Sequence, residues 1–146
     1  MKNCMKMTLP CKRESQNVII FAVIAFTEQL NPNDKELDEI KTAVVEAVDN
    51  CISFAYPKGE GKIYVSCEIF KDKVISIFIK DKGVGIQDLE KAKQPLYSTT
   101  RSRSGLGINV MEVFMDTKIK SVVEKGTTVN LKRRIGRPFR TYNLKD

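Results

Sequence analysis

The chain has 146 residues, of which 42% are hydrophobic and 29% are charged, and its formal net charge is +7. These values are typical of one soluble globular domain that is long enough to bury a core. Five of the seven net positive charges lie in residues 132–146, so the rest of the chain is nearly neutral and we expect no direct binding to nucleic acid. We therefore expect a domain over residues 1–133 and a basic tail over residues 134–146, for which a solubilising role is favoured over contact with nucleic acid.

The longest apolar run, residues 18–26, is shorter than the about 20 residues that a helix needs to cross a bilayer. The amino terminus shows no signal-peptide pattern, so we expect no membrane partner. The four cysteines form no CxxC pair and the chain contains no histidine, which favours free thiols in a reducing cytoplasm over a zinc site. Without histidine, a Ser-His or Cys-His catalytic pair is also excluded.

The first half of the chain reads as a strand followed by two helices. An edge strand is expected over residues 6–9, ended by Pro10. The first helix is expected over residues 14–30; because residues 18–26 are apolar all round, this helix is either fully buried or covered by a second protein. A capping box of Asn33 and Glu36 opens the second helix. The core face of that helix follows i, i+3, i+4 spacing: Ile40, Ala43, Val44, Ala47, Val48 and Cys51.

The second half reads mainly as strands. Residues 62–70 and 74–80 alternate apolar and polar side chains, which predicts an antiparallel hairpin with one buried face. A short acidic helix over residues 88–93 and a polar, basic loop over residues 94–103 follow. A third helix is expected to open at residues 104–107 and to run through Met115, with Leu106, Val110, Val113 and Phe114 facing inward. The last hairpin is expected from residues 119–123 and 127–132.

Glu46 and Asn50 lie one turn apart on the second helix and project away from its core stripe. A carboxylate and a carboxamide placed in this way can activate a nucleophile and hold a hard metal ion side by side. Taken alone, the pair is typical of a solvated helix face.

Asp81-x-Gly83-x-Gly85 directly follows a predicted strand. An ionised aspartate only accepts hydrogen bonds, so it can read the exocyclic amine of adenine, while the two glycines let a flat ring approach the backbone. A plain turn is the ordinary interpretation of this motif in isolation.

Two further glycine motifs come later in the chain. Gly105-Leu106-Gly107, at the start of a predicted helix, offers free backbone N–H groups to a phosphate. Gly126-Thr127-Thr128 can place a hydroxyl beside a base, although both motifs are also common in ordinary turns. None of the motifs is a Walker A loop. Their order between residues 46 and 128 is what indicates a nucleotide site.

The ordered set resembles the GHKL, or Bergerat, ATP-binding fold of gyrase, Hsp90, MutL and sensor histidine kinases. More narrowly, it is similar to the anti-sigma F family, sporulation serine kinases that also sequester a sigma factor. The resemblance spans residues 5–132, and Gln94-Pro95-Leu96-Tyr97 is its most specific part. It implies an α/β two-layer sandwich, in which helices cover one face of a mixed, mainly antiparallel sheet and ATP binds between the helices and a lid.

The resemblance also implies roles for the matching positions. Glu46 would act as the general base for the substrate serine, and Asn50 would hold Mg²⁺ between the phosphates. Asp81 would read the adenine amine, with Thr127 beside the ring and with Gly83 and Gly85 giving it room. Arg103, in a lid formed by residues 96–104, would stabilise the transferring charge; solvation is the ordinary alternative for such an arginine. The remaining nucleotide contacts would come from Thr99, Ser104, Gly105, Leu106 and Gly107.

The implied protein is an ATP-dependent serine kinase and anti-sigma factor that uses ATP or ADP with Mg²⁺. Its partners would be a sporulation sigma factor, an anti-anti-sigma protein that it phosphorylates on serine, and a second copy of itself. Two departures concern these partners: Phe54-Ala55-Tyr56 replaces a His-Gly-Tyr-like sequence, and Ile19-Ile20-Phe21 stands where a basic residue typically meets the partner.

Three alternatives share much of this pattern. One is an ATP-regulated sigma-binding protein without kinase activity, and another is a stress-response anti-sigma kinase with a different partner. A histidine-kinase catalytic domain agrees less well with the sequence, because no helix with a phosphoacceptor histidine precedes the motifs here.

Overall fold

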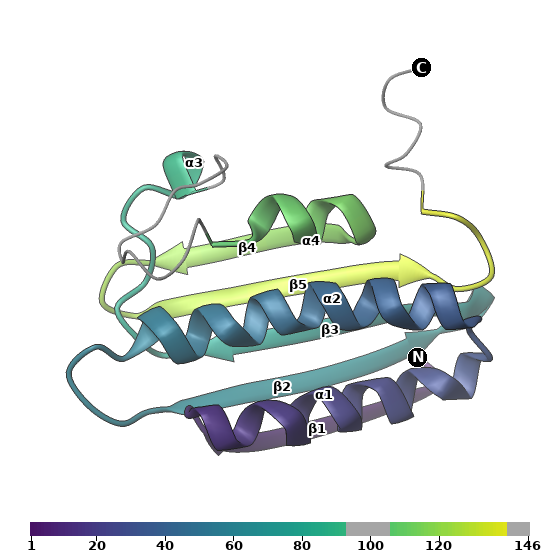
Figure 1. Cartoon of the computed structure of the whole chain (residues 1–146), viewed down its shortest axis with the longest axis horizontal. Helices are drawn as coiled ribbons and strands as arrows, with labels where there is room; N and C mark the ends of the chain where they lie inside the picture. Colours follow the sequence, from purple (N-terminus) through teal and green to yellow (C-terminus); the bar gives the residue numbers. More distant parts are fainter. Residues whose placement is uncertain (93–105, 140–146) are drawn as a thin grey trace.

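The computed structural model describes residues 1–92 and 106–139. Five strands form one sheet in the order β1-β2-β3-β5-β4, and the helices cover one of its faces (Figure 1). The expected two-layer α/β sandwich is thus confirmed. All four strand pairings are antiparallel, so the sheet, expected to be mixed and mainly antiparallel, contains no parallel pair among the described strands.

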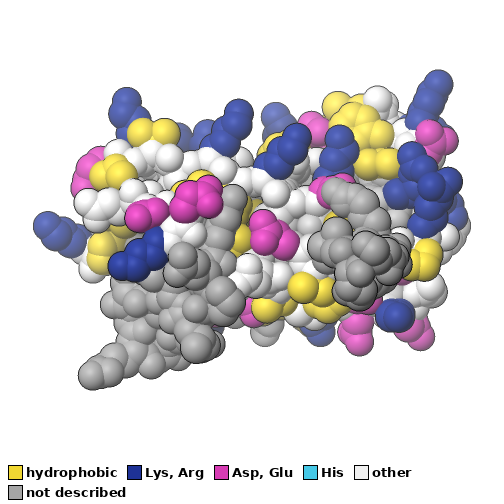
Figure 2. Space-filling view, turned by 90° about the horizontal axis from the view of Figure 1, so that it is seen from above, with side chains coloured by type: hydrophobic (Ala, Val, Ile, Leu, Met, Phe, Trp, Pro, Cys, Tyr) yellow, Lys and Arg dark blue, Asp and Glu magenta, His cyan; other side chains and the backbone are white. Residues whose placement is uncertain are grey.

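Each strand alternates between a core-facing and an outward side chain, as the period of two requires. The strands are β1 (Asn3–Pro10), β2 (Lys62–Phe70), β3 (Val74–Asp81), β4 (Asp116–Val122) and β5 (Gly126–Arg134). The inward residues of β2 and β3 are buried Ile, Val and Cys side chains. On the outer face of the sheet, exposed lysines include Lys6 of β1, Lys80 of β3 and Lys132 of β5. Lys and Arg side chains are spread along the molecule with Asp and Glu among them (Figure 2).

The helices are α1 (Arg13–Thr27), α2 (Asp34–Asn50), α3 (Leu89–Ala92) and α4 (Ile108–Phe114), with a 3₁₀ turn at Glu28–Leu30 and a π-helical turn at Cys51–Ala55. The predicted capping box is confirmed at the start of α2. The Glu36 backbone N–H donates to Oδ1 of Asn33 (2.7 Å), and the Asn33 N–H donates to Oε1 of Glu36 (3.0 Å). Two orphan N–H groups at this helix end are thereby satisfied.

Helix α1 is not buried all round in this single chain. Its inner face, which includes Ile19, Ile20 and Val23, is buried in the core. On its outer face Phe21 and Val18 are 71% and 50% exposed. The first expectation, that this apolar helix is fully buried within the chain, is therefore wrong.

The expected inward face of the third helix is half correct: Leu106 is buried, and Phe114 is partly buried against the core, as predicted. Val110 and Val113, predicted to face the core, are 36% and 41% exposed. The buried side chains are instead Ile108, Met111 and Met115. The helix begins at Ile108, after the left-handed Gly107, and the packing of α4 on the sheet and α2 selects the stripe at i, i+3 and i+7.

The chain continues to pack on the domain beyond the expected boundary between residues 133 and 134. Strand β5 runs through Arg134, and Ile135 and Phe139 are buried. The N–H of Gly136 donates to Oε2 of Glu36 (2.6 Å), which ties this segment to the first turn of α2. Residues 140–146 of the expected tail lie outside the described residues.

Within residues 1–92 and 106–139, no helix combines the length and the apolar character that crossing a bilayer requires. The four cysteines are free thiols, and Cys51 and Cys67 are buried.

Candidate functional site

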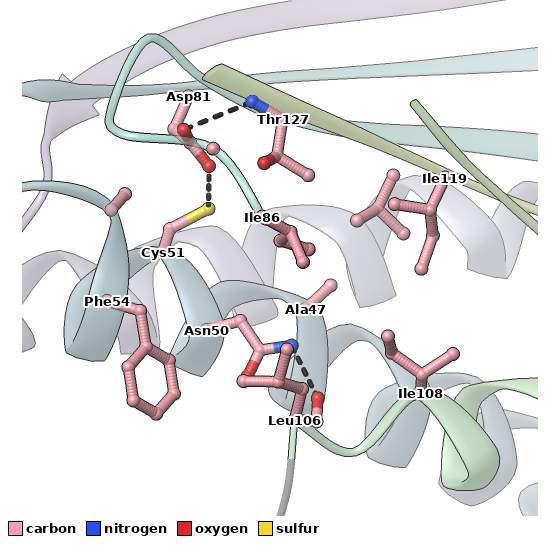
Figure 3. Close-up of a pocket in the computed structure, with 13 residues that line it drawn as sticks. Ala47, Asn50, Cys51, Phe54, Asp81, Ile86, Leu106, Ile108, Ile119 and Thr127 are labelled. Atoms are coloured by element: carbon pink, nitrogen blue, oxygen red, sulfur yellow. Dashed lines mark hydrogen bonds between the residues drawn. The ribbon is translucent and has the colours of Figure 1, made fainter. Parts of the chain in front are cut away.

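A pocket that opens to solvent lies between α2, the bend after β3, and β4 and β5 (Figure 3). Most of its lining is apolar: Ala47, Phe54, Ala55, Ile86, Leu106, Ile108, Ile119 and Val129. Four polar side chains also line it: Asn50, Cys51, Asp81 and Thr127. Apolar walls with a few convergent polar groups are the usual surroundings of a small-molecule ligand.

Asp81 is the last residue of β3, and its side chain is buried at the inner end of this pocket. Its Oδ1 accepts hydrogen bonds from the backbone N–H groups of Gly83 (2.9 Å) and Thr127 (3.3 Å). Its Oδ2 accepts one from the thiol of Cys51 (3.4 Å). A carboxylate offers about four acceptor positions, so Asp81 retains capacity for a donor that enters the pocket.

Two glycines allow the bend after Asp81 to pack closely. A Cβ atom on Gly83 would lie 2.0 Å from the carbonyl oxygen of Ala55, and a Cβ on Gly85 would lie 2.5 Å from that of Val122. Gly85 also has a φ of +76°, a conformation that favours glycine. Gly85 lines the pocket, whereas Gly83 faces Ala55 at the end of the π-helical turn.

Asn50 points into the pocket from the last turn of α2 (Figure 3). Its Nδ2 donates to the carbonyl oxygen of Leu106, which fixes the orientation of the amide. Its Oδ1 is buried, and no described residue donates a hydrogen bond to it. Mg²⁺ accepts amide oxygens as ligands, so Oδ1 of Asn50 is suited to coordinate this ion. The neighbouring Asp49 is instead paired with Arg13 (2.7 Å).

Glu46 lies beside the pocket, one helical turn before Asn50. A Cβ atom built on Gly107 would lie 2.0 Å from Oε1 of Glu46, so the carboxylate rests against the bend that precedes α4. Gly107 has a φ of +70°. The structure therefore brings Glu46 and Asn50 of α2 together with Leu106 and Gly107.

Ser121, which the sequence motifs do not contain, contacts two residues that line the pocket. Its hydroxyl lies 2.8 Å from Oγ1 of Thr127 and accepts a hydrogen bond from the N–H of Ile86 (2.7 Å). Ser121 thus connects β4 to the bend after β3 and to the start of β5. Its one sequence signal is the alternation of β4, which places Ser121 on the same face as Ile119.

Three titratable groups behind Asp81 have raised pKa values. Burial, and then the nearby Asp81 charge, raises the pKa of Cys51 far above that of a free thiol and the pKa of Cys11 to about 11. Burial also raises the pKa of Tyr56. The Tyr56 hydroxyl donates to the Lys62 carbonyl (2.6 Å) and accepts from the Lys82 N–H (2.8 Å), linking the ends of β2 and β3. At neutral pH all three groups therefore stay protonated.

The expected site residues fall into three groups. Asn50, Asp81, Gly85, Leu106 and Thr127 line the pocket, and Glu46, Gly83 and Gly107 adjoin it. The remaining ones lie outside the described residues: Thr99, Arg103, Ser104 and Gly105. Among residues 1–92 and 106–139, no cluster of three or more His, Cys, Asp or Glu side chains could hold a metal ion.

Solved structures with this fold include the RsbU and RsbW domains of Rv1364c from Mycobacterium tuberculosis. That chain matches 94% of this one, and 34% of its own length, with a TM-score of 0.69 at 17% identity. The mycobacterial sensor histidine kinase MprB matches with a TM-score of 0.57 at 14% identity, over 92% of this chain and 100% of its own. At such identities the likeness shows the fold alone.

Sequence comparison shows the family. Residues 12–133 match the model of the histidine kinase-like ATPase domain. The Anti-sigma F factor of Priestia megaterium is 40% identical over 139 residues, which are 92% of this chain and 95% of that protein. The Anti-sigma F factor of Bacillus subtilis (strain 168) is 41% identical over 141 residues, 94% and 96% of the two chains. The chain therefore belongs to the histidine kinase-like ATPase domain family and, within it, to the anti-sigma F factors.

Proposed function

We propose that the chain is an ATP-dependent protein serine kinase that also sequesters a sporulation sigma factor, and that it phosphorylates a serine of an anti-anti-sigma protein. The observation that carries the proposal is the buried Oδ1 of Asn50, for which the described residues provide no donor. A buried acceptor of this kind is costly unless a ligand satisfies it. A magnesium-bound nucleotide in the pocket would do so.

The base of the nucleotide would lie against the apolar wall of the pocket. Asp81 has acceptor capacity left for the exocyclic amine of adenine, and Thr127 stands beside it on β5. Ile86 and Val129 would contact the faces and edges of a flat ring. The matched family is an ATPase domain, which supports ATP or ADP as the ligand.

The phosphoryl transfer would take place where Glu46 and Asn50 adjoin the Gly107 bend. Mg²⁺, when bound at Asn50, would supply charge stabilisation to the phosphates. The acceptor serine oxygen would bond to the γ-phosphorus while the bond to the β–γ bridging oxygen breaks, releasing ADP. Glu46 would take the serine proton, because its carboxylate lies one helical turn from the metal ligand.

Residues outside the described ranges complete this proposal. Arg103 would stabilise charge on the transferring phosphoryl group, and Thr99, Ser104 and Gly105 would contact the phosphates.

The outer face of α1 supports the partner-binding part of the proposal. Val18 and Phe21 are exposed there at i, i+3 spacing, and large exposed apolar side chains on one helix face are characteristic of interaction surfaces. The relatives' name supports a sigma factor as the sequestered protein. A homodimer is proposed as the binding unit.

The test incubates the full chain with γ-labelled ATP, Mg²⁺ and a sporulation anti-anti-sigma protein. We expect label on a serine of the acceptor, and we expect Glu46→Ala to retain ATP binding but to abolish transfer. Glu60→Ala, which removes an exposed loop carboxylate, is the matched control. Transfer that persists in Glu46→Ala would refute the role of Glu46.

Two other outcomes identify the alternatives. A wild-type chain that binds ATP and sigma but transfers no label is an ATP-regulated binding protein. A chain that labels a stress-response acceptor and leaves the sporulation acceptor unlabelled has a different partner.

A further inference from the structure

We infer that Cys51 is a positioning residue for base recognition: its thiol holds Oδ2 of Asp81 in the orientation that receives the adenine amine. The inference rests on the proposed ATP-binding function and extends it to a residue outside the Glu46–Asn50 pair and the Asp81-x-Gly83-x-Gly85 motif.

The position of Cys51 follows from the end of α2. The chain continues from Asn50 into a π-helical turn, and Cys51 is the first residue of that turn. It is buried, it lines the pocket, and its Sγ points at Asp81 (Figure 3). The Sγ–Oδ2 distance is 3.4 Å.

The three donors to Asp81 are divided unequally between its two oxygens. Both backbone N–H groups, from Gly83 and Thr127, bond to Oδ1. Among the described residues, only the thiol of Cys51 donates to Oδ2. Without it the carboxylate would be held at one oxygen, and Oδ2 would be free to turn about that anchor. With it, the unused acceptor position of Oδ2 has a fixed direction.

The chemistry of the thiol agrees with a donor role. The Sγ atom lies 3.4 Å from Oδ2 of Asp81, a distance at which an S–H group donates to a carboxylate oxygen. A thiolate here would repel the carboxylate and could not donate to it. Cys51 is therefore a hydrogen-bond donor to Asp81 and not a nucleophile.

A plain core cysteine is the competing explanation, since Cys51 also packs in the hydrophobic core. The two explanations differ in one measurable way. Loss of packing weakens binding of any purine nucleotide, whereas loss of the Asp81 orientation weakens only a nucleotide that donates from the exocyclic amine. ITP is the suitable probe because it carries an oxygen in place of that amine.

The experiment measures the Kd of ATP and of ITP, each with Mg²⁺, for the full chain and four variants: Cys51→Ala, Cys51→Val, Cys51→Ser and Cys67→Ala. We expect Cys51→Ala and Cys51→Val to weaken ATP about three- to tenfold and to leave ITP within about twofold. Cys51→Val retains side-chain bulk without a donor, and Cys51→Ser retains a donor and restores the preference for ATP. Cys67→Ala deletes another buried thiol, on β2, and keeps the wild-type ratio.

The inference is overturned if Cys51→Ala and Cys51→Val weaken ATP and ITP equally, or if Cys51→Ser behaves like Cys51→Ala. Either result leaves the proposed ATP site intact. A wild-type chain that binds no ATP, or that does not prefer ATP to ITP, overturns instead the proposed reading of adenine by Asp81, and the inference with it.

Discussion

Gly107 and Glu46 are in such close contact that a Cβ atom on the glycine would lie 2.0 Å from Oε1 of the carboxylate. One turn further along α2, Asn50 donates to the carbonyl of Leu106. Two successive residues of the bend before α4 therefore hold the two polar residues of the α2 face. The carboxylate and the amide are positioned as one unit, so a change in the bend is expected to act on both.

Gly107→Ala is expected to reduce phosphoryl transfer about tenfold or more, with a smaller loss of nucleotide binding, because the new methyl group displaces the Glu46 carboxylate. The free energy of unfolding should also fall by about 1–2 kcal/mol, because φ at this residue is +70°. Transfer assays and urea unfolding measure the two effects. Gly136→Ala is the control: its φ is +95°, but no atom of residues 1–92 or 106–139 lies within 4 Å of the added Cβ. Equal losses of transfer in both variants would contradict the contact with Glu46.

Asn50→Ala is expected to change the free energy of unfolding by less than about 1 kcal/mol without nucleotide. The variant loses the hydrogen bond to Leu106, but it also removes a buried oxygen to which no described residue donates, and the two effects are of similar size. In contrast, the rise in Tm on addition of Mg·ATP should be largely lost. Thermal unfolding with and without Mg·ATP tests this, and Asp49→Ala on the same turn should keep the full rise. An undiminished rise in Asn50→Ala would remove Asn50 as the metal ligand.

Glu39→Gln is expected to lower the free energy of unfolding by about 3 kcal/mol, because it leaves the buried Arg133 charge without its carboxylate. The pair is 2.9 Å apart and both side chains are buried. Arg13 and Asp49 form a more exposed pair, with side chains 60% and 21% exposed, and Asp49→Ala should cost less than about 1 kcal/mol. Urea unfolding compares the two. Similar losses of unfolding free energy in Glu39→Gln and Asp49→Ala would show that burial does not set the strength of the Glu39–Arg133 pair.

The buried thiol of Cys67 is expected to make the fold less stable in alkali. Burial raises its pKa from 9.0 to about 12, so between these values the unfolded chain loses a proton that the folded chain keeps. Stability from this group is thus complete below pH 9 and declines as the pH rises toward 12. When the pH rises from 8 to 10, the free energy of unfolding should therefore fall by about 1 kcal/mol less in Cys67→Ala than in the wild type. Urea unfolding at the two pH values measures it, with Cys4→Ala, an exposed thiol, as control; identical slopes in all three proteins would refute the assignment.

Phe21→Ser is expected to reduce binding to the partner protein at least tenfold while leaving the free energy of unfolding within about 0.5 kcal/mol. The side chain is 71% exposed on the outer face of α1, so its loss creates no cavity. Pull-down or calorimetric titration with the sigma factor in the presence of ATP measures the effect. Val123→Ser, which replaces an exposed side chain in the turn between β4 and β5, should bind normally. Unchanged binding in Phe21→Ser would exclude this face of α1 as the contact surface.

Local sequence patterns predicted much of the fold. Alternation predicted the hairpin of β2 and β3, and the Asn33–Glu36 pair predicted the start of α2 with its capping box. These features depend on neighbours within one strand or one helical turn, which is the range over which periodicity carries information. For the third helix, the prediction was correct for Leu106 and Phe114 and wrong for Val110 and Val113. The helix begins only after Gly107, and packing on α2 and the sheet selects its buried stripe.

The sequence alone determined which residue types were available to the site: a carboxylate and an amide one turn apart on a helix, and an aspartate at a strand end beside glycines. Tertiary structure alone decided how they meet. The antiparallel pairing of β3 with β5 sets Asp81 opposite Thr127, and the π-helical turn after α2 brings the Cys51 thiol to the same carboxylate. Contacts between residues 51 and 81, or 81 and 127, depend on how strands pair and helices pack across long loops, and no local period encodes that geometry.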